Sequence, residues 1–205
     1  VLDDVIADLN EAKGYIDAGL DTSITADIFT SVDIENSVNA LLARFNLMAG
    51  NYDAAITAAN NVDLSVKSTW EYDASIPNPL AFWFGSQNVT QAKDLTFGLP
   101  TDLLPDENDE RIPFYITAED LEAETPNYQV VGFWSDNVDE IPVYLPGEIM
   151  LIKAEAYARS NDLTSAVTEL NAVLTKTSSS DIYGLGANLP EYLSLIHISE
   201  PTRRS

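Results

Sequence analysis

The chain has 205 residues, of which 33 are Asp or Glu and 10 are Lys or Arg, so its formal net charge is −23. Because the acidic residues are spread along the chain, they indicate a solvated surface and argue against nucleic acid or an anionic membrane as a partner. The absence of cysteine excludes disulfides, zinc-thiolate sites and thiol chemistry, and the length is sufficient for one domain with a sizeable core.

Residues 1–62 carry the apolar periodicity of helices and are predicted to form the first half of the core. One helix is expected from Val1 to about Ala18 and a short one from about Tyr52 to Asn60. Between them, Asp33 is a suitable N-cap for a longer helix, and Gly50 suits the left-handed conformation that ends it. The sequence therefore predicts three helices in this part of the chain.

Residues 145–175 are predicted to form a helical hairpin, because apolar residues recur at three- and four-residue steps on both sides of Asn161-Asp162. Residues 40–62 align with residues 151–173 without a gap when 111 is added to each number, and Gly50-Asn51 then falls on Asn161-Asp162. Two helix-turn-helix units with small residues at the crossing positions are typical of tetratricopeptide-type repeats, which gain stability by stacking. The predicted fold is mostly α, with tetratricopeptide-like helical hairpins and a long irregular insertion between them.

That insertion spans residues 63–144 and holds all three tryptophans and seven of the ten prolines. Turn signals are frequent, and one short helix is expected from Thr117, as N-cap, to about Ala123. A long segment with little regular structure inside a compact domain is usually functional, so we expect the binding surface here. The polar residues 176–192 are expected to form a loop.

Aromatic rings in the insertion stand beside polar residues in three places. These are Trp70 with Tyr72 and Asp73, Phe82-Trp83-Phe84 before Ser86-Gln87-Asn88, and Phe133-Trp134 before Ser135-Asp136-Asn137. A sugar ring can lie on such a ring while amides and carboxylates bond its hydroxyls, although the same rings can instead anchor the insertion to the helices as core. The preferred ligand-binding residues are Trp83 and Trp134, with Trp70, Tyr72 and Asn88 as further candidates.

The acidic run Asp106–Glu110 invites comparison with a calcium-binding loop, because hard cations prefer several oxygen ligands. The glycine that such a loop needs for its turn is replaced by Arg111, and no glutamate stands at the bidentate position. A solvated acidic turn is the better interpretation, with Arg111 as a structural ion-pair partner. No metal site is predicted.

Glu148 and Glu155 invite comparison with the carboxylate pair of a glycosidase. Residues two helical turns apart lie roughly 10 Å apart along the axis, beyond the usual separation, and Arg159 stands four residues after Glu155 as an ion-pair partner. With no glycine-rich phosphate loop and no cysteine nucleophile, no catalytic residue and no cofactor are predicted. The shift of 111 also places Arg44 on Glu155, which predicts an Arg44–Glu155 ion pair between the repeats.

Four blocks of sequence, taken in order, resemble the SusD/RagB family of Bacteroidota outer-membrane lipoproteins. The blocks are VLDDVIADLNEAK, ALLARFNLMAGNYDAAITAA, Asp109-Glu110-Arg111 with Phe114-Tyr115, and YLPGEIMLIKAEAYARSNDLTSAVTELNAVLTK. The resemblance covers roughly residues 1–192. It implies a partial SusD-like domain, and it implies that an N-terminal signal, a lipidated cysteine and C-terminal helices lie outside this sequence.

The resemblance also implies a function. Members of the family are cell-surface, tetratricopeptide-based binders of glycans or other nutrients, which deliver oligosaccharide to a SusC-like TonB-dependent outer-membrane transporter. They are not enzymes, and their contact with the membrane is through a lipid anchor. A helical-repeat adaptor that contacts only partner protein is the alternative, and an enzyme of glycan breakdown is a third.

Residues 193–205 are expected to be foreign to the domain. The run LSLIHISEPTR resembles a translated sequencing adapter and contains the only histidine, His197. The functional prediction therefore makes no use of His197.

Overall fold

The computed structural model describes residues 1–20, 31–86, 91–119 and 127–192, and this part of the chain is mostly helical, as predicted. The described residues contain five longer α-helices, two short ones and four short strands. In chain order they are α1 (Leu2–Asp17), α3 (Ile34–Ala49), α4 (Tyr52–Asn60), β1 (Thr69–Trp70), α5 (Pro79–Ala81), α6 (Arg111–Tyr115), β2 (Ile116–Glu119), β3 (Asn127–Val130), β4 (Ile141–Pro142), α7 (Pro146–Arg159) and α8 (Leu163–Leu174). His197 and the rest of the predicted foreign tail lie outside the described residues.

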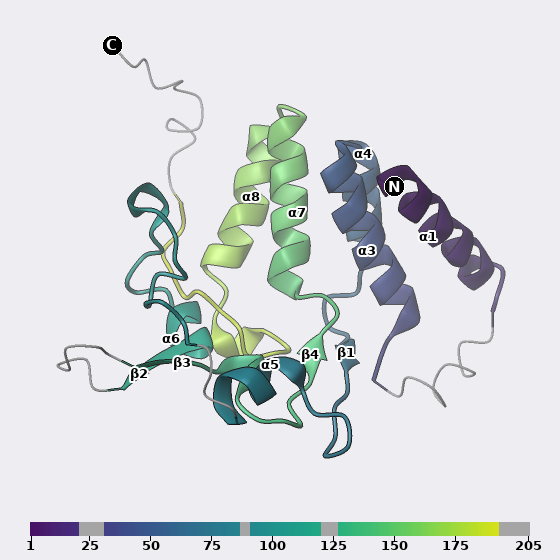
Figure 1. The fold of residues 1–205 in the computed structure, drawn as a ribbon. Helices are drawn as coiled ribbons and strands as arrows, with labels where there is room; N and C mark the ends of the chain where they lie inside the picture. Colours follow the sequence, from purple (N-terminus) through teal and green to yellow (C-terminus); the bar gives the residue numbers. More distant parts are fainter. Residues whose placement is uncertain (21–30, 87–90, 120–126, 193–205) are drawn as a thin grey trace, which may run out of the picture.

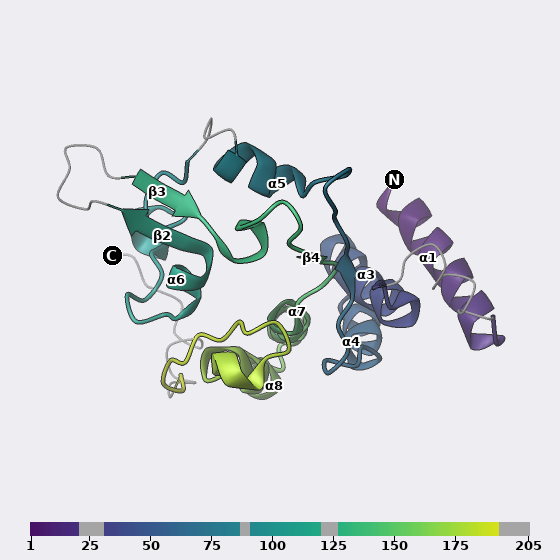
Figure 2. The ribbon, with the colours of Figure 1, turned by 90° about the horizontal axis from the view of Figure 1, so that it is seen from below.

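Four of the longer helices form two hairpins, α3–α4 and α7–α8, which pack against each other mainly through α4 and α7. Ala43, Ala55 and Ala156 are completely buried in the core that they share, and such small side chains allow the helix backbones to approach closely. The outer helix α1 packs on α3. Figure 1 shows these helices side by side, with most of residues 63–144 gathered at one end of them, and Figure 2 shows the helices of the two hairpins nearly end-on, with α1 seen from its side.

The signals that begin and end these helices act as predicted. Asp33 accepts a hydrogen bond from the Asn36 backbone N–H at 2.8 Å, and Gly50 ends α3 with φ of 80°. In the second hairpin, Asn161 has φ of 63° and Asp162 caps α8 by accepting from the Ser165 N–H at 3.1 Å. Both turns thus satisfy backbone groups that the helices leave unpaired.

Residues 63–144 contain more regular structure than predicted. Strand β1 pairs with β4 in an antiparallel ladder, with Thr69 opposite Pro142 and Trp70 opposite Ile141. A second antiparallel ladder joins β2 and β3. The predicted helix that begins at Thr117 is wrong, because Thr117 lies in β2 opposite Gln129; the β-branched pair Ile116-Thr117 favours a strand, and cross-strand pairing outweighs the local capping signal. The remainder of that predicted helix lies outside the described residues.

Asn78 joins several parts of this middle segment. Its side chain is fully buried, donates to the carbonyls of Phe133 and Asp139 at 2.9 and 2.8 Å, and accepts from the backbone N–H groups of Leu80 and Ala81. One amide therefore caps α5 and holds the chain that leads into β4. A buried polar side chain that is satisfied in this way fixes the relative position of the segments it joins.

The ion pair between the hairpins was predicted with the wrong carboxylate. Arg44 pairs with Glu148, with Nε and Oε1 2.6 Å apart, whereas Glu155 pairs with Arg159 on its own helix at 2.7 Å. Aligning two repeats matches equivalent positions, but units stacked in series bring non-equivalent positions into contact. The matched charges of Arg44 and Glu155 therefore carried no information about which residues meet.

Candidate functional site

The structure separates the aromatic residues that the sequence singled out. Trp70 and Trp83 are 43% and 53% exposed, whereas Trp134 is half-buried. Trp70 and Tyr72 line one groove, and Trp134 lines a different pocket. Trp83 lies edge-on to Phe82, with 5.6 Å between ring centroids. Asn88 lies outside the described residues.

The groove at the edge of the β1–β4 ladder combines aromatic rings with carboxylates. Its volume is about 610 Å³. The lining residues that define this Trp70 groove are Trp70, Glu71, Tyr72, Asp73, Ile76 and Glu140. Ligand sites commonly pair apolar faces with a few well-placed polar groups, and this groove has that composition.

The alternation of side chains along β1 explains the position of Trp70. Thr69 is buried and Trp70 is exposed, because successive residues of a strand point to opposite faces. Thr69 is held on two sides: its backbone N–H donates to the Ser31 carbonyl at 3.0 Å, and its hydroxyl donates to Glu140 at 2.9 Å. The strand that carries Trp70 is therefore fixed, which reduces the entropy lost when a ligand binds.

Asp73 supplies a carboxylate to the Trp70 groove from a tight turn. Its Oδ1 accepts from the backbone N–H groups of Ser75 and Ile76 at 2.7 and 2.8 Å. These bonds, first that from Ile76 and then that from Ser75, lower the pKa of Asp73 below its ordinary value. Asp73 is therefore ionised at neutral pH and can accept hydrogen bonds from a ligand.

The Trp134 pocket, about 540 Å³, is aromatic and apolar. Its lining includes Trp134, Tyr115, Phe84, Phe97, Leu80 and Val130. Trp134 stacks on Tyr115 with ring centroids 5.6 Å apart, and Tyr115 in turn meets Phe114 edge-on. Burial raises the pKa of Tyr115 to about 12, so its hydroxyl is neutral. Trp134 thus packs as part of an aromatic cluster that holds α6 against the chain before β4. This arrangement agrees with the alternative interpretation of the aromatic residues, in which they anchor the insertion as part of the core.

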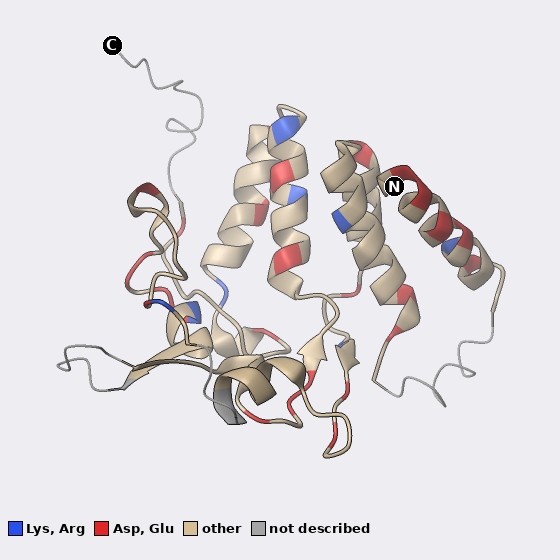
Figure 3. Cartoon of the chain, in the orientation of Figure 1, with Lys and Arg blue, Asp and Glu red and all other residues tan. Residues whose placement is uncertain are grey.

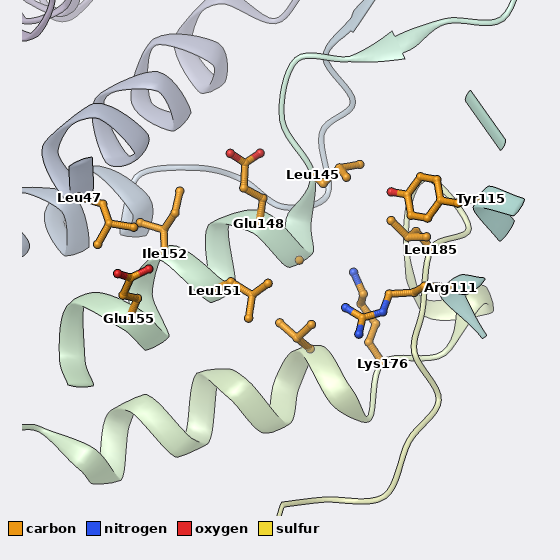
Figure 4. A pocket seen from close by; sticks show the side chains of 12 residues that line it. Leu47, Arg111, Tyr115, Leu145, Glu148, Leu151, Ile152, Glu155, Lys176 and Leu185 are labelled. Atoms are coloured by element: carbon orange, nitrogen blue, oxygen red, sulfur yellow. The ribbon is translucent and has the colours of Figure 1, made fainter. Parts of the chain in front are cut away.

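A third cavity, about 320 Å³, lies between the α7–α8 hairpin and residues around α6 (Figure 4). Figure 4 shows Arg111 beside Lys176, with Glu148 and Glu155 on α7. All four charged residues have ion-pair partners: Asp109 for Arg111, Asp181 for Lys176, Arg44 for Glu148 and Arg159 for Glu155. The predicted Glu155–Arg159 pair is thereby confirmed. Because these charges are already engaged, the cavity offers a ligand few polar partners.

Arg111 is an ion-pair partner of the acidic run before α6, as predicted, but the predicted solvated turn is only partly correct, because Asp109 is buried while its neighbours are exposed. Asp109 is buried and accepts from the Arg111 guanidinium through both carboxylate oxygens, at 2.9 Å for Oδ1 and 2.5 Å for Oδ2. Within the described ranges, no group of three or more His, Asp or Glu side chains is placed to hold a metal ion. None of the helices described is both long and apolar enough to cross a membrane.

Comparison of the chain with protein-family models, with curated proteins and with solved structures finds no match. The function of the protein is therefore inferred from its residues and their geometry.

The sequence identified Trp70, Tyr72 and Asp73 but missed the other carboxylates of the Trp70 groove. Glu140 is 71 residues from Thr69, to which it is hydrogen-bonded. Only the β1–β4 ladder brings them together, and two-residue strands have no distinctive sequence pattern. Glu71 could have been found, since it lies between the two aromatic residues of the same stretch.

Proposed function

We propose that the protein binds oligosaccharide through the Trp70 groove. The observation that carries this proposal is an exposed indole, 43% accessible, at a groove of about 610 Å³ that also contains Tyr72 and carboxylates. The hydrophobic face of a sugar ring can lie on the indole, while its hydroxyls donate to Asp73 and Glu140. Binding of this kind is reversible capture and needs no catalytic group.

The resemblance to the SusD/RagB family supports a proposal for where the protein acts and with which partner. The two stacked hairpins α3–α4 and α7–α8, with alanines where they meet, support a tetratricopeptide-like scaffold. On this proposal the protein is a surface-exposed outer-membrane lipoprotein of Bacteroidota, not an enzyme, and it passes oligosaccharide to a SusC-like TonB-dependent transporter. The scaffold holds the groove, and the middle segment supplies the contacts to the ligand.

Affinity gel electrophoresis with a panel of soluble polysaccharides tests the proposal. At least one polymer is expected to retard the wild-type chain, and Trp70→Ala is expected to weaken that binding at least about five-fold, since a ring contact is worth about 1 kcal/mol beyond its buried area. Trp83→Ala is the matched control, because Trp83 is at least as exposed as Trp70 but lies edge-on to Phe82 outside the Trp70 groove.

Other results of the electrophoresis experiment would point to a different site or a different function. Retardation that depends on Trp83 and not on Trp70 would move the site to the position that the sequence favoured. If no polymer retards the wild-type chain, the protein-only adaptor is the better description. Release of reducing sugar from any polymer would show an enzyme of glycan breakdown instead.

A further inference from the structure

The charged residues that line the Trp70 groove are all acidic. Three of its lining residues are acidic, Glu71, Asp73 and Glu140, and its described lining includes no Lys or Arg. Figure 3 shows acidic residues on the chain that follows β1 and on the chain that precedes β4. These carboxylates come from both sides of the β1–β4 ladder, so the acidic lining of the groove is not a run along one segment.

An adjoining cavity, which shares Glu140 with the Trp70 groove, is lined by a cation. Lys67 shares that cavity with Glu140 and Tyr183, and its Nζ lies 5.5 Å from the centre of the Tyr183 ring. Glu140 accepts one hydrogen bond from the Thr69 hydroxyl through Oε2. Asp73 uses Oδ1 for the backbone of its turn. A ligand that enters the groove therefore meets aromatic faces and carboxylates together.

We propose that the Trp70 groove selects glycans that carry free, positively charged amino groups, such as oligomers of unacetylated hexosamine, over neutral and acidic glycans. This inference rests on the proposed function, because it names the class of sugar that the same groove takes. An ammonium group is attracted to the face of an indole or phenol ring, and it donates charge-assisted hydrogen bonds to carboxylates; both interactions favour binding. A uronate in the same position would be repelled by three like charges.

The experiment must separate the groove from the overall charge of −23, which attracts any polycation. Titration calorimetry at an ionic strength of about 0.15 M limits that long-range attraction to roughly 8 Å. The probes are three oligosaccharides of equal length: β-1,4-linked glucosamine, its fully N-acetylated form and oligogalacturonate. The first two differ only in acetylation, which removes the charge of the amine and adds an acetyl group, so the groove variant below is what assigns the difference to the carboxylates. The pH is held at about 6, where carboxylates are ionised.

The groove variant is Glu71→Gln, Asp73→Asn and Glu140→Gln together. The changes at Asp73 and Glu140 keep an oxygen that can accept the hydrogen bonds which these carboxylates now accept. The matched control neutralises three exposed carboxylates on the helices, Asp8→Asn, Glu35→Gln and Asp53→Asn, and so changes the net charge equally. Circular dichroism of both variants establishes that they remain folded.

We expect the glucosamine oligomer to bind at least ten-fold more tightly than its N-acetylated form, and oligogalacturonate to bind most weakly. The groove variant should lose this preference and the control should keep it. Equal affinity for the first two oligomers, or an equal loss in groove variant and control, would overturn the charge selectivity while glycan binding stands. Absence of binding by every oligosaccharide, together with no retardation by any polysaccharide, would overturn both.

Discussion

Arg44 of α3 and Glu148 of α7 form a two-bond ion pair between the hairpins, with Nε and Oε1 2.6 Å apart and Nη2 and Oε2 3.0 Å apart. Arg44 also donates to the Val143 carbonyl at 3.2 Å, just before α7 begins. Both side chains are half-buried. The pair therefore fixes the start of α7 against the first hairpin.

Removing the charge of Glu148 is expected to weaken this junction. Glu148→Gln should lower the free energy of unfolding by about 1 kcal/mol, since charge-assisted hydrogen bonds in a half-buried pair are stronger than exposed ones. Glu155→Gln breaks an exposed pair on a single helix and should cost less than about 0.5 kcal/mol. Urea denaturation of both variants measures the difference. A cost for Glu155→Gln that equals or exceeds that for Glu148→Gln would contradict this account.

Asn78→Ala is expected to lower the free energy of unfolding by about 3 kcal/mol. The change leaves two partly buried carbonyls and two backbone N–H groups without the amide that now satisfies them. Limited proteolysis should then cut residues 63–144 before it cuts the helices. Asn10→Ala removes an exposed side-chain bond within α1 and serves as control. Equal proteolysis of the two variants would show that Asn78 does not hold the segment together.

Two glycines should respond in opposite directions to alanine. A Cβ at Gly186 would lie 2.3 Å from the backbone carbon of Thr177, so Gly186→Ala forces the chain after α8 apart and should cost about 2–4 kcal/mol. A Cβ at Gly14 in α1 meets nothing within 4 Å, so Gly14→Ala should add about 0.5–1 kcal/mol of stability. Thermal unfolding of both variants tests the prediction, and a stabilising Gly186→Ala would refute the close approach.

Tyr115 should make stability depend on pH in the alkaline range. Burial raises its pKa from 10.0 to about 12, so between these values the unfolded chain has released a proton that the folded chain retains. Its contribution is complete below about pH 10 and is lost as pH rises to about 12. Tyr115→Phe should therefore reduce the fall in unfolding free energy across this window, measured by urea denaturation at several pH values. If the free energy of unfolding falls equally for wild type and Tyr115→Phe in this pH range, Tyr115 does not contribute to the pH dependence of stability.

The sequence predicted those parts of the fold that local signals determine. Asp33, Gly50 and Asp162 mark helix ends through bonds to residues next to them, and these helices lie where they were expected. The β1–β4 ladder was missed because its two residues per strand depend on contacts between distant segments. For the same reason Arg44 was assigned to Glu155, and Thr117 to a helix.

The candidate site likewise has features that the sequence predicted and features that depend on contacts between distant segments. Trp70, Tyr72 and Asp73 were found because ring and carboxylate are neighbours in the chain. Trp134 looked equivalent in sequence, and only the rings of Tyr115 and Phe133 around it reveal that it is packed on other aromatic groups. Residue type identifies what a side chain can do, whereas exposure depends on which segments cover it.

The pairing of Thr69 with Pro142 means that the chain leaves the helical hairpins and returns to them at nearly one point. A loop with its ends clasped in this way can change in length and content at small entropic cost. If the Trp70 groove binds glycan as we propose, its ligand preference can change through substitutions and insertions between the two strands, while the helical hairpins keep their structure.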